Sequence, residues 1–246
     1  MPVRSWLSVL SGVLWTTACL AAGDQSAARD RGSPARAPDP WADAREAMVA
    51  RQIEARGVRS PAVLAAMRKV ARHLFVPADL VRDAYDDTPL PIGFGQTISQ
   101  PYIVAYMSEA LDVGREHTVL EIGTGSGYQA AVLGELAGRV YTIEIVAELG
   151  ERASRTLREL GYENVEVRVG DGYLGWPEQA PFDRIMVTAA PDHVPQPLID
   201  QLKVGGKLIV PVGRGVQDMT IVTKHADRVV TETTIPVRFV PLTRKP

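Results

Sequence analysis

The stretch Val119-Leu120-Glu121-Ile122-Gly123-Thr124-Gly125-Ser126-Gly127-Tyr128 carries the strongest local signal in this chain of 246 residues. Glycine at every second position lets the backbone turn tightly and lets a ligand approach the main chain. The apolar residues 118–122 ahead of the loop predict a strand, and residues 128–137 after it predict a helix. A strand, a glycine loop and a helix in this order are typical of a nucleotide site.

Strands and helices continue to alternate beyond this loop. Further strands are predicted at 139–144, 165–169, 182–188 and 207–212, with helices up to residue 160 and at 197–202. Residues 220–223 and 229–237 are expected to be closing strands. Such alternation predicts an α/β fold of the Rossmann-like type, a doubly wound and mostly parallel sheet.

The region ahead of the glycine loop predicts a helical and loop addition. A helix over 43–56 ends at Gly57, and Ser60-Pro61 begins another helix with an apolar face. Residues 85–100 are rich in proline, glycine, aspartate and threonine, so a long loop is expected there. Pro101 then begins a helix that runs to about residue 111.

The N-terminus predicts a separate organisation. Residues 1–22 resemble a secretory signal peptide, with Arg4, an apolar run and small residues at its end. Residues 23–43 are interpreted as a disordered linker, which leaves 44–246 as the catalytic domain. The alternative is that the chain starts at Met48, so export stays open. The apolar run is too short and interrupted for a stable membrane span.

Composition narrows the class of protein. A net charge of -2 lacks the basic balance expected of a nucleic-acid binder. One cysteine, Cys19, and four scattered histidines at 73, 117, 193 and 225 give no metal-ligand spacing, so no metal site is predicted.

Acidic residues around the glycine loop indicate which nucleotide it binds. Tyr128 stands where the dinucleotide fingerprint has its third glycine. Glu121 suits an ammonium group better than a pyrophosphate. Glu144 ends the second strand, where a carboxylate accepts hydrogen bonds from ribose, and Asp171 follows the third strand. This set favours S-adenosylmethionine over NAD; the alternative is a tight turn flanked by solvated acids.

The loop Pro89-Leu90-Pro91-Ile92-Gly93-Phe94-Gly95-Gln96-Thr97-Ile98-Ser99-Gln100-Pro101 is the second informative stretch. Thr97 and Ser99 place hydroxyls directly before a helix. From the residues alone, capping of that helix by Ser99 or Gln100 is favoured over catalysis.

Five segments together resemble the protein-L-isoaspartate (D-aspartate) O-methyltransferase family. They are MVARQIEARG (48–57), GQTISQP (95–101), LEIGTGSGYQAA (120–131), LIDQLKVGGKLIVPVG (198–213) and VRFVPLT (237–243). GQTISQP is specific to that family, whereas many methyltransferases share the glycine loop. The N-terminal extension and a tail that stops soon after Thr243 depart from the family's pattern.

The resemblance implies roles for individual residues. Ser99 corresponds to the active-site serine. The residues implied for cofactor binding are Thr97, Ile98, Glu121, Gly123, Gly125, Gly127, Glu144, Asp171, Gly172 and Thr243. Those implied for binding the substrate are Ile98, Ser99, Val237, Phe239 and Val240.

The implied activity is transfer of a methyl group from S-adenosylmethionine to the free α-carboxylate of L-isoaspartyl residues in damaged proteins and peptides. A monomer in the cytoplasm is expected, with an exported protein as the alternative location. Two other functions stay open: a methyltransferase for another acceptor, and an exported, non-catalytic relic that binds a peptide or adenosyl ligand.

Overall fold

The structure is a computed structural model that describes residues 39–244. The predicted signal peptide 1–22 and residues 23–38 of the predicted linker lie outside the described residues. Residues 39–43, assigned to the linker from the sequence, are part of the fold instead. Helix α1 (Ala42–Ala47) begins there, and the Trp41 ring lies 5.6 Å from the His73 ring and 6.2 Å from the Tyr85 ring.

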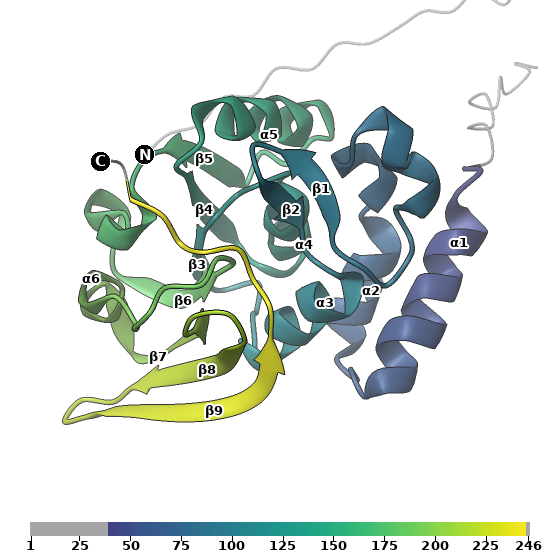
Figure 1. Cartoon of the computed structure of the whole chain (residues 1–246). Helices are drawn as coiled ribbons and strands as arrows, with labels where there is room; N and C mark the ends of the chain where they lie inside the picture. Colours follow the sequence, from purple (N-terminus) through teal and green to yellow (C-terminus); the bar gives the residue numbers. More distant parts are fainter. Residues whose placement is uncertain (1–38, 245–246) are drawn as a thin grey trace, which may run out of the picture. The chain divides into compact units, whose positions relative to one another are not determined.

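A seven-stranded sheet forms the centre of residues 39–244 (Figure 1). The strand order is β5-β4-β3-β6-β7-β8-β9, with β3 to β7 parallel and the last two antiparallel. The strands are β3 (Thr118–Ile122), β4 (Arg139–Glu144), β5 (Val165–Val169), β6 (Phe182–Val187), β7 (Leu202–Val212), β8 (Gln217–Lys224) and β9 (Val229–Val237). The predicted doubly wound sheet is confirmed, and its order reverses between β3 and β6, where such sheets bind ligands.

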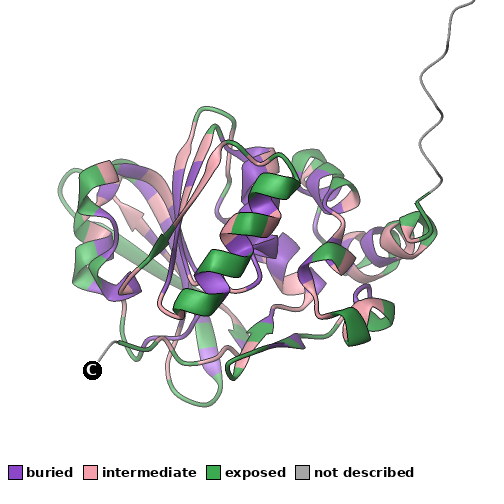
Figure 2. Ribbon diagram, turned by 90° about the horizontal axis from the view of Figure 1, so that it is seen from above, coloured by how far each residue is buried: buried purple, intermediate pink, exposed green. Residues whose placement is uncertain are grey.

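Helices cover both faces of the sheet because strand residues alternate between them. Val119 packs on one face against residues of α3 (Pro101–Ala110) and α4 (Tyr128–Leu136). Leu120 packs on the other face with Leu198 of α6 (Gln196–Asp200). Figure 2 shows the buried strands between helices with exposed outer faces. The longest described α-helix, α5 (Ala147–Glu159), has 13 residues, and no helix within 39–244 is long and apolar enough to cross a membrane.

The N-terminal addition packs its apolar residues against α4. The first helix continues from α1 through a wider turn at Met48–Ile53 and a tight turn at Glu54–Arg56, and it ends as predicted at Gly57 with φ of 105°. Helix α2 (Pro61–Lys69) begins as predicted, because the Ser60 hydroxyl accepts a hydrogen bond from the amide of Val63.

The predicted long loop over 85–100 is wrong for its second half. Strands β1 (Leu90–Gly93) and β2 (Gln96–Ile98) form an antiparallel hairpin there. Gly93, Phe94 and Gly95 turn the chain with φ of 92°, 54° and 69°. The strands have only four and three residues, and Pro91 lies inside β1, so the sequence pattern did not indicate them.

Residues 238–244, here called the C-terminal segment, run beside the end of β6. The amide of Ala190 donates to the carbonyl of Val240, and the amide of Leu242 donates to the carbonyl of Ala190, both at 2.8 Å. The side-chain amide of Gln217 accepts from the amide of Phe239 at 2.8 Å. These bonds hold the segment across the end of the sheet where β3 and β6 meet (Figure 1).

Candidate active site

The glycine loop turns directly after β3, at the reversal of strand order. Gly123, Gly125 and Gly127 have φ of 98°, 53° and 89°, a region that residues with a Cβ rarely adopt. Space is also short at the first glycine, because a Cβ on Gly123 would lie 2.4 Å from Thr188 Oγ1. The loop backbone therefore lies directly against the end of β6.

Glu144 holds this loop in place from the end of β4. Its Oε2 accepts from the amide of Gly125 at 2.7 Å, and its Oε1 accepts from the amide of Val146 at 3.0 Å. The side chain is buried, but it lines the cavity described below. Each carboxylate oxygen has further acceptor capacity, which is available to a ligand.

Glu121 does not reach this cavity. It shares the face of β3 with Val119, so its fully buried side chain lies beneath the helices. Thr142 Oγ1 donates to its Oε2 at 2.5 Å, and Thr142 in turn pairs with Thr124 Oγ1 at 2.7 Å. Burial raises the pKa of Glu121 to about 8. Any effect of Glu121 on a ligand is therefore indirect, because only Thr124 at the end of this chain lines the cavity.

Asp171 also lies outside the cavity, although its neighbour lines it. Asp171 Oδ1 accepts from the amide of Tyr173 at 2.9 Å and so caps the turn Gly172–Leu174. Gly172 approaches the sheet so closely that a Cβ would lie 2.3 Å from Ile122 Cγ2.

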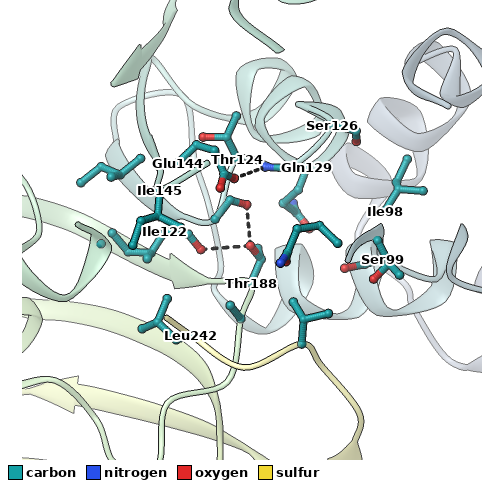
Figure 3. A pocket seen from close by; sticks show the side chains of 18 of the residues that line it. Ile98, Ser99, Ile122, Thr124, Ser126, Gln129, Glu144, Ile145, Thr188 and Leu242 are labelled. Atoms are coloured by element: carbon teal, nitrogen blue, oxygen red, sulfur yellow. Dashed lines mark hydrogen bonds between the residues drawn. The ribbon is translucent and has the colours of Figure 1, made fainter. Parts of the chain in front are cut away.

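The cavity above the glycine loop, here called the cofactor cavity, joins parts of the chain that are distant in sequence. Figure 3 shows Glu144, Thr188 and Ser99 around it. The sequence-predicted residues that line it are Thr97, Ile98, Ser99, Gly123, Gly125, Glu144, Gly172, Val240 and Thr243. Besides Glu121 and Asp171, Gly127 is absent from the lining; it is the N-cap residue of α4, and a Cβ on it would point toward α5, 3.3 Å from Ala153 Cβ.

Ser99 has a hydroxyl that no helix cap uses. The side chain of Gln100, at the start of α3, donates to Asp87 Oδ2 at 2.7 Å. Asp87 Oδ1 accepts the amide of Tyr102 at 3.1 Å, so it is Asp87 that caps α3. Gln100 occupies the N-cap position of α3, as one of the two predicted alternatives had it, but the side chain of Gln100 makes no capping hydrogen bond to the helix. Within residues 39–244 the Ser99 hydroxyl makes no hydrogen bond.

A second cavity, here called the neighbouring cavity, adjoins the first. It is lined by the sequence-predicted residues Val237, Phe239 and Val240, while Ile98 lines only the cofactor cavity. The charged residues in its described lining are Arg56 and Arg238. Four residues line both cavities, and three of them bear hydroxyls: Thr97, Ser99, Thr188 and Val240.

Several lining residues were not identified from the sequence. They include Thr124, Ser126, Gln129, Ile145, Thr188 and Leu242. Thr124 and Ser126 lie within the quoted glycine loop, where the spacing drew attention only to the glycines. Thr188 follows directly after β6, and a position after a parallel strand is a signal for a ligand site once the strand order is known.

The chemistry of the cofactor cavity fits a cationic ligand. Glu144 is the charged residue in its described lining, so no Lys or Arg there can bind a phosphate. Backbone groups of the glycine loop and a carboxylate after β4 suit an amino acid moiety and a ribose. The fold and this cavity define the class of S-adenosylmethionine-dependent methyltransferases.

Comparison with known proteins identifies the family. A family model described as protein-L-isoaspartate(D-aspartate) O-methyltransferase matches residues 43–246. The protein-L-isoaspartate O-methyltransferase of Gloeobacter violaceus is 63% identical over 200 residues, covering 80% of this chain and 98% of that protein. The protein of that name from a Synechococcus species is 58% identical over 217 residues, covering 85% and 89%. A solved protein-L-isoaspartate O-methyltransferase matches with a TM-score of 0.74 and 32% identity, covering 80% of this chain and 65% of that one.

This chain therefore belongs to the protein-L-isoaspartate(D-aspartate) O-methyltransferase family. The resemblance expected from the five sequence segments is confirmed.

The buried Glu121 makes the stability of the folded protein depend on pH in a specific way. The folded-state pKa of about 8 exceeds the ordinary value of 4.5, so the folded protein retains a proton that the unfolded chain has released. Its stabilising effect is present below pH 4.5 and is lost as pH rises toward 8. We expect Glu121→Gln to unfold like the wild type near pH 5 and to be more stable by a few kcal/mol near pH 9, since one pKa unit corresponds to about 1.4 kcal/mol.

Urea unfolding of both proteins from pH 5 to pH 9 measures this difference. Glu159→Gln, at an exposed position of α5, is the matched control and should follow the wild type throughout. A constant difference between Glu121→Gln and the wild type at all pH values contradicts the prediction.

Proposed function

We propose that this protein transfers a methyl group from S-adenosylmethionine to the α-carboxylate of L-isoaspartyl residues, with Ser99 orienting the acceptor. The observation that carries the proposal is the junction between the two cavities. Arg56 lines the neighbouring cavity, but its guanidinium is paired with Asp87 Oδ2 at 2.6 Å. The cofactor cavity thus bears a negative charge from Glu144, and the neighbouring cavity bears a positive charge from Arg238. That pairing suits a cationic donor on one side and an anionic acceptor on the other.

The reaction needs orientation and exclusion of water more than it needs proton transfer. When bound, S-adenosylmethionine supplies an activated methyl group on a positively charged sulfur. The acceptor carboxylate is already ionised at neutral pH, so no general base is required. The carboxylate oxygen forms a bond to the methyl carbon, the carbon–sulfur bond breaks, and its electron pair stays on the sulfur.

Ser99 has the position and the free hydroxyl to direct this attack. It donates a hydrogen bond to one carboxylate oxygen and leaves the other to react. Ser99, Thr188 and Val240 are half-buried at the junction, so fixed dipoles there replace part of the water that opposes the approach of opposite charges. Thr97 lines the same junction and contributes a second hydroxyl.

The C-terminal segment supplies main-chain groups for a peptide. The amide of Val240 and both main-chain groups of Arg238 make no hydrogen bond to other residues within 39–244. An extended peptide can pair with these groups and place an isoaspartyl residue at the junction, independent of its side-chain sequence. The extra methylene of isoaspartate in the peptide backbone is then distinguished by register along the segment.

A peptide pair tests the activity directly. The full chain is incubated with methyl-labelled S-adenosylmethionine and two peptides that differ only in Asp or isoAsp at one position. We expect base-labile label on the isoAsp peptide alone, because only that peptide presents an α-carboxylate at the branch. Label on neither peptide, with the cofactor still bound, contradicts the proposal and favours a methyltransferase for another acceptor.

The role of Ser99 predicts a selective effect of Ser99→Ala. The kcat/KM for the isoAsp peptide should fall about 10- to 100-fold, the loss of one hydrogen bond to a charged group, while the Kd for S-adenosylmethionine changes little. Ser154→Ala, on α5 and outside both cavities, is the control and should leave both quantities unchanged. Equal losses of activity and cofactor affinity would assign Ser99 to the cofactor or the fold.

We also propose that the protein is a monomer that acts in the cytoplasm, with a methyltransferase domain that includes residues from 39 onward. The supply of S-adenosylmethionine in the cytoplasm supports this location. The signal-like residues 1–22 lie outside the described residues and leave export as the alternative. Mass spectrometry of the mature N-terminus from fractionated cells should find uncleaved protein in the cytoplasm, and cleavage near residue 22 would contradict this.

A further inference from the structure

Thr188 lies at the reversal of strand order, directly after β6. Its amide donates to the carbonyl of Ile122 at 2.9 Å. Its hydroxyl lies 2.6 Å from the carbonyl oxygen of Gly123 and 3.0 Å from that of Ile122 (Figure 3). Carbonyl oxygens only accept hydrogen bonds, so the single hydroxyl proton of Thr188 is directed to the backbone of β3 and its loop.

This commitment of the proton determines what Thr188 offers to a ligand. A threonine oxygen has two acceptor sites besides its one donor. With the proton bound to the loop, Oγ1 can present only lone pairs to its other side. Oγ1 is therefore a poor partner for an anionic acceptor and a good partner for a positive centre.

The location of Thr188 identifies that positive centre. Thr188 is one of four residues that line both cavities. The methyl group must pass from the cofactor cavity to the neighbouring cavity, so the atoms that carry it must face this junction. Ser99, also at the junction, has an uncommitted proton and suits the carboxylate. The Ser99 hydroxyl thus suits the negatively charged carboxylate, and the Thr188 hydroxyl suits the positively charged donor.

We propose that Thr188 is a positioning residue whose Oγ1 accepts weak C–H···O contacts from the positively polarised methyl group of the donor. Through these contacts Thr188 distinguishes S-adenosylmethionine from its product S-adenosylhomocysteine. The inference rests on the proposed methyl transfer and extends it. Contacts of C–H groups with oxygen are weak, but a positive charge on the adjacent sulfur strengthens them. After transfer the sulfur is neutral and the attraction is lost, which favours exchange of product for donor.

A purely structural role for Thr188 makes a different prediction. The same hydroxyl supports the glycine loop through Gly123. If loop support were its only role, removing the hydroxyl would weaken the binding of donor and product equally, because both contain the same adenosine and amino acid groups. The ratio of the two affinities separates the roles, and it does not depend on catalysis.

Calorimetric titration of the full chain with S-adenosylmethionine and with S-adenosylhomocysteine tests the inference. In Thr188→Val and in Thr188→Ala we expect the ratio of donor Kd to product Kd to rise about three- to fivefold over the wild type. Thr188→Ser keeps the oxygen and should keep the wild-type ratio. Thr234→Val, which removes a β9 hydroxyl that donates to the Met219 carbonyl, is the matched control.

Two results would overturn the inference. Parallel losses for donor and product in both oxygen-free variants would leave only loop support. A changed ratio in Thr188→Val alone would indicate steric conflict with the added methyl group, because Thr188→Ala lacks the oxygen without adding bulk. No acceptor peptide is present in the titrations, so a failed peptide assay and a failed titration are distinguishable.

Discussion

The close approach of the glycine loop to the end of β6 constrains the rest of this site. Gly123 leaves no room for a side chain against Thr188, and the loop must turn there through left-handed backbone angles. Glu144 stabilises the turn from the next strand by accepting the amides of Gly125 and Val146. Three parallel strands therefore meet at one backbone turn, and every other element of the site is placed relative to it.

Two segments, one before and one after the sheet in sequence, complete the site around that turn. The hairpin of β1 and β2 leads into Ser99, and Asp87 ahead of it caps α3 and so orients the start of that helix. The C-terminal segment is paired with Ala190 and held by Gln217. Both segments form walls of both cavities, so the transfer point is defined by their packing and not by the sheet alone.

Charge is distributed unevenly around this point, because only one of two buried glutamates reaches the cofactor cavity. The carboxyl of Glu121 lies beneath the helices and is protonated through neutral pH, because burial raises its pKa. Glu144 lines the cavity and accepts hydrogen bonds from two backbone amides. Two glutamates on neighbouring strands thus differ in position: Glu121 belongs to the core and Glu144 lines the cofactor cavity.

Local pattern determined the elements of this fold well, because strand alternation and helix capping depend on residues close in sequence. Strands β3, β4, β5 and β9 have the predicted bounds, and Gly57 ends the first helix as expected. The family resemblance, carried by GQTISQP and four other segments, also came from the sequence.

The tertiary structure decided which of these residues share a cavity. Glu121 proved to point into the core beneath α3 and α4 instead of into the cavity at the end of β3, and Asp171 proved to cap a turn. No sequence pattern around Thr188 marked it as a site residue, since Thr188 reaches the cavity only because β6 lies beside β3. The short hairpin before Ser99 was equally hidden, because it is stabilised by packing against distant helices and not by its own propensity.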